Sequence, residues 1–263
     1  MKNRARKETS ELSRRDFIKT SAALGAAAWA TGTSRMYAAG SDKIRVGLIG
    51  CGGRGTHDTG NCLNAAENVE LVAMGDLFKD RLDSSRARLS KSAAGKVKVT
   101  DETCFVGWDA HKKVLALPNV DLVVLTTAPH FRPIHFKAAV EAGKHVFMEK
   151  PVAVDPVGVR SVIESSALAE TKNLTILAGT QMRRIAHLMA GIERIHNGDI
   201  GEIVGGQCVR IGDGMTTWGP RERQAGWTDM EWQLRRWLFM TWLSGDFITE
   251  MHVHNLDIMD WAM

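Results

Sequence analysis

A glycine-rich hexapeptide that directly follows a short apolar run constrains the fold more than any other feature. Residues 44–49 read IRVGLI, and the next six residues are Gly50-Cys51-Gly52-Gly53-Arg54-Gly55. In this G-x-G-x-x-G spacing the first glycine permits a tight turn, the second lets backbone approach a diphosphate, and the third lets a helix pack closely on the strand. We therefore predict a strand, a phosphate-binding loop formed by these six residues, and a helix whose N-terminus faces the phosphates.

Short apolar runs recur along the first part of the chain and alternate with amphipathic stretches of helix length. Near-continuous Val, Ile and Leu runs separated by helices are typical of a parallel sheet that helices cover on both faces. The pattern predicts an α/β fold, a doubly wound parallel sheet of the Rossmann type. The expected strands are residues 44–49, 69–74, 120–125, 145–148 and 174–178.

An acidic residue follows the second of these runs. Asp76 lies 21 residues after Gly55. A carboxylate there accepts hydrogen bonds from the 2′-hydroxyl of an adenosine ribose and repels a 2′-phosphate. This favours NAD as the cofactor, while Arg54 or Lys79 as a partner for a phosphate keeps NADP open. The alternative is an ordinary glycine turn with a solvent-facing Asp.

The basic residues concentrate at the N-terminus. The whole chain has a formal net charge of +4, yet residues 1–39 hold eight Lys and Arg against three acidic residues. The remainder is close to neutral. Because nucleic-acid binding needs basic side chains clustered on a folded face, we expect no nucleic-acid partner.

The basic leader contains SRRDF at residues 13–17 and an Ala-rich, weakly apolar run at 20–30. It resembles a twin-arginine export signal. A stable membrane span needs about 20 strongly apolar residues, so we expect no lasting insertion. The resemblance implies passage through the twin-arginine translocase, cleavage near Ala38 or Ala39, and a periplasmic or extracytoplasmic location. An unremarkable basic tail is the alternative.

Residues 139–155 read AVEAGKHVFMEKPVAVD. With the glycine-rich loop and the TTAP sequence at 126–129, this stretch closely resembles the glucose-fructose oxidoreductase, inositol dehydrogenase and MocA family. The resemblance implies a cofactor wall at Thr127, a cofactor–substrate junction at Glu149 and Lys150, and a cis bond from Lys150 to Pro151. A Lys at the carboxyl edge of a sheet can hydrogen-bond a substrate hydroxyl. The alternative is a surface Lys paired with Glu149.

The second half resembles the start of the family's substrate-side domain, of α+β type. We expect a helix over 185–197, a turn at 199–202 and a strand near 203–211. Arg183 is a candidate for the substrate site, although a surface pair is an equal alternative, and Trp218 is a candidate for stacking on a sugar. The domain prediction is a signal peptide over 1–39, a nucleotide-binding domain over 40–180 and a partial substrate and oligomerisation domain over 181–263.

The sequence SGDFITEMHVHNLD at 244–257 looks like the family's active-site helix, in which an Asp precedes a His by four residues and x-x-Asp follows. Here Glu250 takes the Asp position, His254 the His position, and Asp257 closes the pattern. Residues i and i+4 share a helical face, so the Glu250 carboxylate can orient the imidazole. We expect His254, with an ordinary pKa close to neutral, to take the hydroxyl proton as a hydride leaves the same carbon, and Lys150 to polarise the oxygen.

Two alternatives concern the histidines. His254 can be a packing residue, and Glu250, His252 and His254 would face one side for a metal if this segment were an extended strand. The apolar spacing favours a helix, and the four cysteines lack C-x-x-C spacing, so we expect no metal site. His130 and His135 are expected to be structural.

The leading hypothesis is an exported NAD(P)-dependent oxidoreductase that acts on a hydroxyl of a sugar, inositol or related polyol. One alternative is an NAD-dependent glycosidase that works by transient oxidation and elimination, and another is a non-catalytic sugar-binding protein. The resemblance implies a homo-oligomer in the full-length form. Because the chain stops inside the active-site helix, before the open sheet that the family builds next, we expect a truncated chain that binds NAD but turns over poorly.

Overall fold

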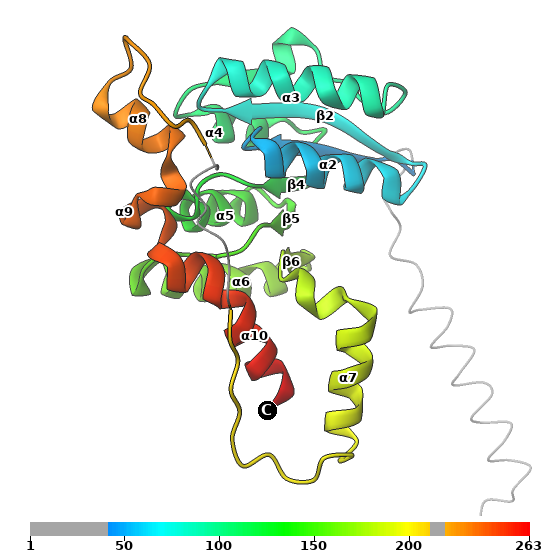
Figure 1. Cartoon of the computed structure of the whole chain (residues 1–263). Coiled ribbons are helices and arrows are strands. Elements are labelled where there is room, and N and C mark those ends of the chain that lie inside the picture. The colour runs from blue at the N-terminus through cyan, green and yellow to red at the C-terminus, as the bar shows by residue number, and fades with distance from the viewer. Residues whose placement is uncertain (1–41, 211–218) are drawn as a thin grey trace, which may run out of the picture. The chain divides into compact units, whose positions relative to one another are not determined.

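A sheet of six parallel strands forms the centre of the computed structural model, which describes residues 42–210 and 219–263 (Figure 1). The strand order is β3-β2-β1-β4-β5-β6, and all five neighbouring pairs are parallel. The order reverses between β1 and β4, which is where open α/β sheets bind ligands beyond the carboxyl ends of their strands. The strands are β1 (Ile44–Ile49), β2 (Val69–Asp76), β3 (Cys104–Val106), β4 (Leu122–Leu125), β5 (His145–Met148) and β6 (Ile176–Ala178).

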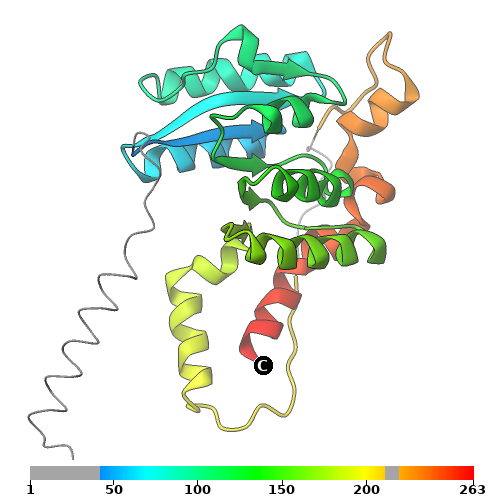
Figure 2. The same cartoon turned by 180° about the vertical axis from the view of Figure 1, so that it is seen from behind.

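Five helices cover the two faces of this sheet (Figures 1 and 2). One core packs α2 and α3 against one face, and a second core packs α4, α5 and α6 against the other. In β4, Val124 belongs to the first core while Val123 and Leu125 belong to the second. Alternate residues of a strand point to opposite faces, so a sheet buried on both sides reads as a continuous apolar run. The helices are α2 (Gly53–Ala65), α3 (Lys79–Ser92), α4 (Ala110–Ala116), α5 (Arg132–Glu141) and α6 (Pro156–Thr171).

The sheet confirms the predicted fold class, with differences at the strand ends. β3 was not predicted, because three residues carry too little periodicity to be recognised. β4 and β6 each begin two residues later than expected. The strand expected near 203–211 was wrong over its described part, since residues 203–210 have no regular structure. A strand needs a neighbour to accept its backbone hydrogen bonds, and no described strand pairs with this segment.

The second half contributes mainly helices. α7 (Ala186–His196) lies beside α10 (Val253–Ala262) in both views, and a hydrogen bond of 2.9 Å joins His196 Nε2 to the carbonyl oxygen of Trp261. Between them in the chain come α8 (Asp229–Arg235), α9 (Thr241–Ser244) and one π-helical turn (Ile248–His252). Residues 44–263 form one compact unit, so the domain boundary at residue 180 stays a prediction.

Candidate cofactor and active site

The glycine-rich loop has the geometry that its spacing predicts. Gly50 has a φ of +98°, and a Cβ there would lie 2.6 Å from the backbone nitrogen of Thr127. A Cβ on Gly55 would lie 2.0 Å from the carbonyl oxygen of Gly50, so the helix can approach the strand only without a side chain. Gly52, which precedes α2, has no atom within 4 Å of such a position, and its backbone is therefore open to a ligand. The three glycines fit the roles of turn, approach and packing.

Asp76 ends β2 beside this loop. Its carboxylate accepts hydrogen bonds from the backbone N–H of Cys51 at 2.5 Å and of Phe78 at 2.8 Å. Burial raises the pKa of Asp76, while these two hydrogen bonds oppose the rise. The carboxylate is thus held in one orientation at the carboxyl edge of the sheet. This arrangement fits a carboxylate that accepts hydrogen bonds from a ribose.

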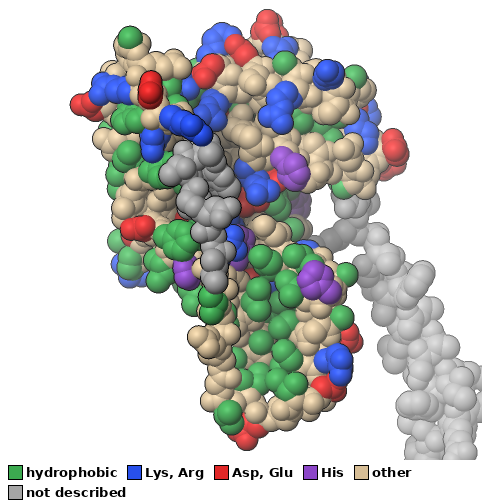
Figure 3. Space-filling model, viewed as in Figure 1, with side chains coloured by type: hydrophobic (Ala, Val, Ile, Leu, Met, Phe, Trp, Pro, Cys, Tyr) green, Lys and Arg blue, Asp and Glu red, His purple; other side chains and the backbone are tan. Residues whose placement is uncertain are grey.

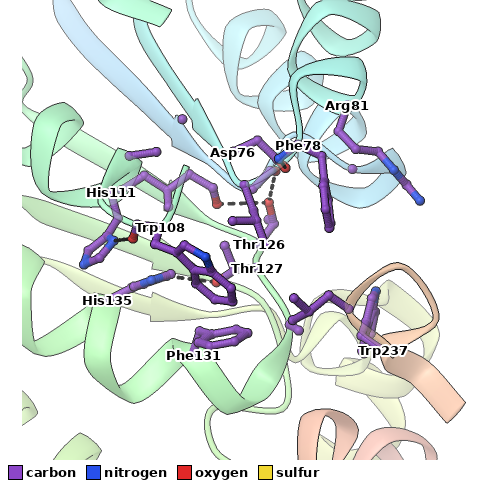
Figure 4. A pocket seen from close by; sticks show the side chains of 18 of the residues that line it. Asp76, Phe78, Arg81, Trp108, His111, Thr126, Thr127, Phe131, His135 and Trp237 are labelled. Atoms are coloured by element: carbon purple, nitrogen blue, oxygen red, sulfur yellow. Dashed lines mark hydrogen bonds between the residues drawn. The ribbon is translucent and has the colours of Figure 1, made fainter. Parts of the chain in front are cut away.

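A cleft opens beyond the carboxyl ends of β1, β2 and β4, and Figure 4 shows the side chains around it. Four predicted cofactor residues line it, namely Gly50, Gly52, Asp76 and Thr127. The remaining predicted cofactor residues lie outside this lining. Cys51 is buried in the core, and Gly53 and Gly55 lie in the first turn of α2. Arg54 is half-exposed, and its guanidinium lies 3.6 Å from the carboxylate of Asp58 and 4.0 Å from that of Glu149. Glu149 and Lys150 directly follow β5.

Two histidines support the floor of the cleft. His135 Nδ1 lies 3.0 Å from the hydroxyl of Thr127, and its ring lies 4.1 Å from the ring of His111. Burial lowers the pKa of His135 to about 3, with the charges of His111 and Arg132 acting in the same direction. His135 is therefore an uncharged positioning group for Thr127, consistent with the structural role expected from the sequence. Its contact with the cleft was missed because it depends on the packing of α5 against α4.

Lys150 comes directly after β5, and its bond to Pro151 is cis, as the family resemblance implies. Its ammonium donates a hydrogen bond of 2.7 Å to Glu250 Oε1 and another to the backbone oxygen of Glu250. Both side chains are nearly buried, at 12% and 7% exposed. Burial raises the pKa of Glu250, and the charge of Lys150 opposes the rise. Glu250 Oε2 has no hydrogen-bond partner among the described residues, which leaves one buried acceptor open.

The Glu250 carboxylate accepts a hydrogen bond from Lys150, whereas the sequence predicts that it orients His254. Residues 248–252 form a π-helical turn that leads into α10, so the helix between Glu250 and His254 is not a regular α-helix. A buried carboxylate also gains more from a cation than from a neutral imidazole. The orientation of His254 by Glu250 stays a prediction.

His254 begins the first turn of α10 and is 5% exposed. Burial lowers its pKa to about 4, with the charges of Lys150 and Arg210 acting in the same direction. The imidazole is accordingly neutral at pH 7 and free to accept a proton, but it is a weaker base than the ordinary histidine assumed from the sequence. Because the segment is helical, the metal arrangement that required an extended strand does not occur.

The two predicted substrate residues have different outcomes. Arg183 donates from Nε to Asp257 Oδ1 at 2.8 Å and lies 3.4 Å from Asp260, so it ties the turn before α7 to α10. This favours the alternative of a structural ion pair, and a substrate role for Arg183 stays a prediction. Trp218 lies outside the described residues.

Comparisons with known proteins agree with this geometry. Residues 44–180 match the family model described as an oxidoreductase family with an NAD-binding Rossmann fold. Residues 11–28 match the twin-arginine translocation signal, which supports export by that route. None of the helices in the described residues has the length and apolar character to cross a membrane.

Curated relatives include a glycosyl hydrolase family 109 protein of Solibacter usitatus, 32% identical over 62% of this chain and 37% of the relative. Another is the myo-inositol 2-dehydrogenase of Thermotoga maritima, 28% identical over 60% of this chain and 42% of the relative. The chain thus spans less than half the length of these two relatives.

Among solved structures, the myo-inositol 2-dehydrogenase of Lactobacillus plantarum has a TM-score of 0.59 at 21% identity, covering 84% of this chain and 56% of that one. At this identity the likeness shows the fold alone. The family model, in contrast, covers half of the chain, and its range contains the glycine-rich loop, Asp76 and Lys150. The chain belongs to the glucose-fructose oxidoreductase, inositol dehydrogenase and MocA family of oxidoreductases, with an NAD-binding Rossmann domain.

Proposed function

We propose that this protein is an exported, NAD-dependent oxidoreductase that moves a hydride between nicotinamide and a hydroxyl-bearing carbon of a sugar, inositol or related polyol. The observation that carries the proposal is the buried ion pair of 2.7 Å between Lys150 and Glu250 at the carboxyl end of β5. His254 lies close enough for the charge of Lys150 to lower its pKa. Lys150 comes directly after β5, at the same carboxyl edge of the sheet as the cleft that we expect to hold the cofactor.

The residues of the cleft fit a dinucleotide. The open backbone at Gly52 and the N-terminus of α2 suit the diphosphate, and the carboxylate of Asp76 suits the ribose of NAD. Arg81 also lines the cleft and keeps NADP as a second possibility. When bound, the nicotinamide supplies the chemistry of hydride transfer.

The chain's own residues supply the proton chemistry. Lys150 donates a hydrogen bond to the substrate oxygen, and Glu250 holds the Lys150 ammonium in place. His254 is uncharged at neutral pH and accepts the hydroxyl proton at one of its ring nitrogens. Glu250 and His254 are buried and the Lys150 side chain is only 12% exposed, so the oxygen that changes charge is shielded from water.

The export signal supports a periplasmic or extracytoplasmic place of action after passage through the twin-arginine translocase. We also infer a homo-oligomeric assembly. Exposed apolar side chains on the face formed by α7, α10 and residues 200–209 support this inference. Size-exclusion chromatography with light scattering tests it, and a monomer at micromolar concentration would count against it.

The first test is to denature the purified protein, identify the released nucleotide, and then follow a panel of polyols and sugars at the nicotinamide absorbance. Bound NAD together with polyol-dependent reduction supports the proposal. Bound NAD with no reduction of the cofactor by any polyol counts against the reaction but not against the cofactor.

The relatives named as glycosyl hydrolase family 109 proteins support a second candidate. In that reaction, transient oxidation of a sugar carbon acidifies the neighbouring C–H, and elimination then breaks the glycosidic bond and releases the aglycone. Addition of water and return of the hydride to the oxidised carbon would complete net hydrolysis. Glycoside cleavage without net formation of NADH favours this candidate. A third candidate, non-catalytic sugar binding, predicts sugar affinity that is unchanged in both Lys150→Ala and His254→Ala.

A further inference from the structure

Part of the cleft wall comes from the C-terminal part of the chain. Leu234, Arg235 and Trp237 line the same cleft as Asp76 and Phe78. Figure 4 shows Trp237 opposite Phe78 across this space, and Figure 1 shows α8 beside the corresponding edge of the sheet. The family match ends at residue 180, so this wall is an addition to the matched nucleotide-binding domain.

Arg235 joins this wall to the nucleotide-binding domain. Its guanidinium donates to both carboxylate oxygens of Asp80, at 2.9 and 3.0 Å, across a sequence separation of 155 residues. Its Nε donates a hydrogen bond of 2.9 Å to Glu231 Oε1, one turn earlier in α8, and this contact fixes the orientation of the guanidinium. The guanidinium also lies 4.0 Å from the centre of the Phe78 ring. A bidentate, charge-assisted pair with a stacked aromatic ring has one well-defined geometry.

The position of this contact identifies the part of the cofactor that it covers. Asp76, Phe78 and Asp80 follow one another at the end of β2 and the start of α3. The carboxylate at the end of this strand marks the ribose of the adenosine half in a Rossmann domain. Leu234 and Trp237 add apolar surface beside Phe78, and an aromatic slot of this kind stacks a nucleobase.

We propose that residues 228–239, which we call the adenosine clamp, close over the adenosine half of NAD, and that the pair between Arg235 and Asp80 holds them there and slows cofactor release. The inference rests on the proposed function, because it assumes that NAD is the ligand of the cleft. Slow release suits an exported enzyme that binds its cofactor before export, because little free NAD is available outside the cytoplasm to replace a cofactor that dissociates. Arg235 acts in this scheme as a positioning residue.

The test measures NAD dissociation from the full-length protein by chasing bound NAD with excess unlabelled nucleotide. Asp80→Asn removes the charge that Arg235 holds. Because the Asp80 side chain is 63% exposed, we expect NAD release to become about two- to fivefold faster. Asp83→Asn is the matched control. Asp83 lies on the same helix, is about half-exposed and pairs with Lys79 at 2.6 Å, and it makes no ion pair with Arg235.

A second ligand separates a clamp on adenosine from a general weakening of the fold. ADP-ribose contains the adenosine half of NAD and lacks nicotinamide. We expect Asp80→Asn to weaken ADP-ribose binding by the same factor as NAD binding, while the unfolding temperature without nucleotide matches that of Asp83→Asn. Trp237→Ala should weaken both ligands as well, because it removes the apolar wall.

Equal release rates from Asp80→Asn and Asp83→Asn would overturn the clamp. An effect on NAD without an effect on ADP-ribose would also overturn it, since the contact would then act on the nicotinamide half. Faster release from Asp80→Asn in a protein that oxidises no polyol supports the clamp and contradicts only the proposed reaction. A wild-type protein without NAD affinity contradicts both.

Discussion

The two halves of the described chain are held together in different ways. Residues 44–180 bury apolar side chains on both faces of the sheet, whereas residues 181–210 and 219–263 contribute few buried apolar side chains, namely Ile192, Leu234 and Leu243. Two ion pairs, Lys150 with Glu250 and Asp80 with Arg235, also join the second part to the first. The first part therefore has an extensive core of its own, whereas the second part is attached to it through a few buried apolar side chains and these ion pairs.

The second half also exposes more apolar side chains on its surface. Figure 3 shows apolar side chains gathered over α7, α10 and the coil between residues 200 and 209. Val204 is 96% exposed, and Ile200, Val209 and Leu256 are more than half exposed. Such side chains contribute little to the stability of this chain, because they remain in water after folding.

The largest expected effect concerns the ion pair between the two halves at the active site. Lys150→Ala removes the donor to the substrate oxygen and leaves Glu250 buried without its cation. We expect kcat/KM to fall by about 10²–10⁴-fold, the range for loss of an acid–base group, with NAD affinity retained. Steady-state kinetics and nucleotide titration measure the two quantities. Lys137→Ala, which removes an exposed Lys paired with Glu141, is the control, and equal rates in the two variants would contradict the assignment.

The next effect compares the packing of the two halves directly. Leu125 is 0% exposed in β4, and Leu256 is 56% exposed on α10. Leu125→Ala should lower the free energy of unfolding by about 2–5 kcal/mol, because it leaves a cavity in the core. Leu256→Ala should change it by less than about 0.5 kcal/mol. Chemical denaturation measures both, and similar losses would show that the second half has a core of its own.

The glycine-rich loop offers a test within the first half alone. Gly55→Ala places a Cβ against the carbonyl oxygen of Gly50, which cannot move without the strand. We expect a loss of about 1–3 kcal/mol in the free energy of unfolding without nucleotide. Gly53→Ala meets no atom within 4 Å and gains helix propensity, so the protein should be as stable or slightly more stable. A stable Gly55→Ala variant would show that α2 packs less closely on β1 than described.

The last effect, which vanishes at neutral pH, is a dependence of stability on pH. Burial lowers the pKa of His135 to about 3 from the ordinary 6.5. Between pH 6.5 and about pH 3, the His135 imidazole is therefore protonated in the unfolded chain but neutral in the folded chain. The contribution of this histidine to the free energy of unfolding is fully present above pH 6.5 and decreases as the pH falls. The slope for one such group is at most about 1.4 kcal/mol per pH unit.

His254, with a pKa lowered to about 4, acts in the same direction from the second half. His135→Phe should flatten the dependence between pH 6.5 and 4.5, measured by chemical denaturation at each pH. The control His57→Phe replaces a histidine whose side chain is 62% exposed and should leave the dependence unchanged. An unchanged slope in His135→Phe would show that other groups carry it.

The sequence predicted most of the first half because its signals are local. The loop Gly50–Gly55, the acid at Asp76 and the apolar runs each depend on neighbouring residues, and the structure contains them at the expected places. The expected strand near 203–211 failed because pairing depends on a partner elsewhere. The sequence did not predict the π-helical turn at 248–252 or the ion pair of Glu250 with Lys150, because neither follows from i+4 spacing.

By itself, the sequence determined the fold class, the nucleotide-binding loop, the export signal and the candidate residues Lys150 and His254, since each follows from residue type and short-range spacing. Tertiary structure alone decided which charges meet. It brought Glu250 to Lys150 across 100 residues and Arg235 to Asp80 across 155. It also lowered the pKa of His254 to about 4. The burial of a side chain and the charges beside it depend on segments that are far apart in the sequence. Only the folding of the whole chain brings these segments together, so local sequence patterns do not reveal them.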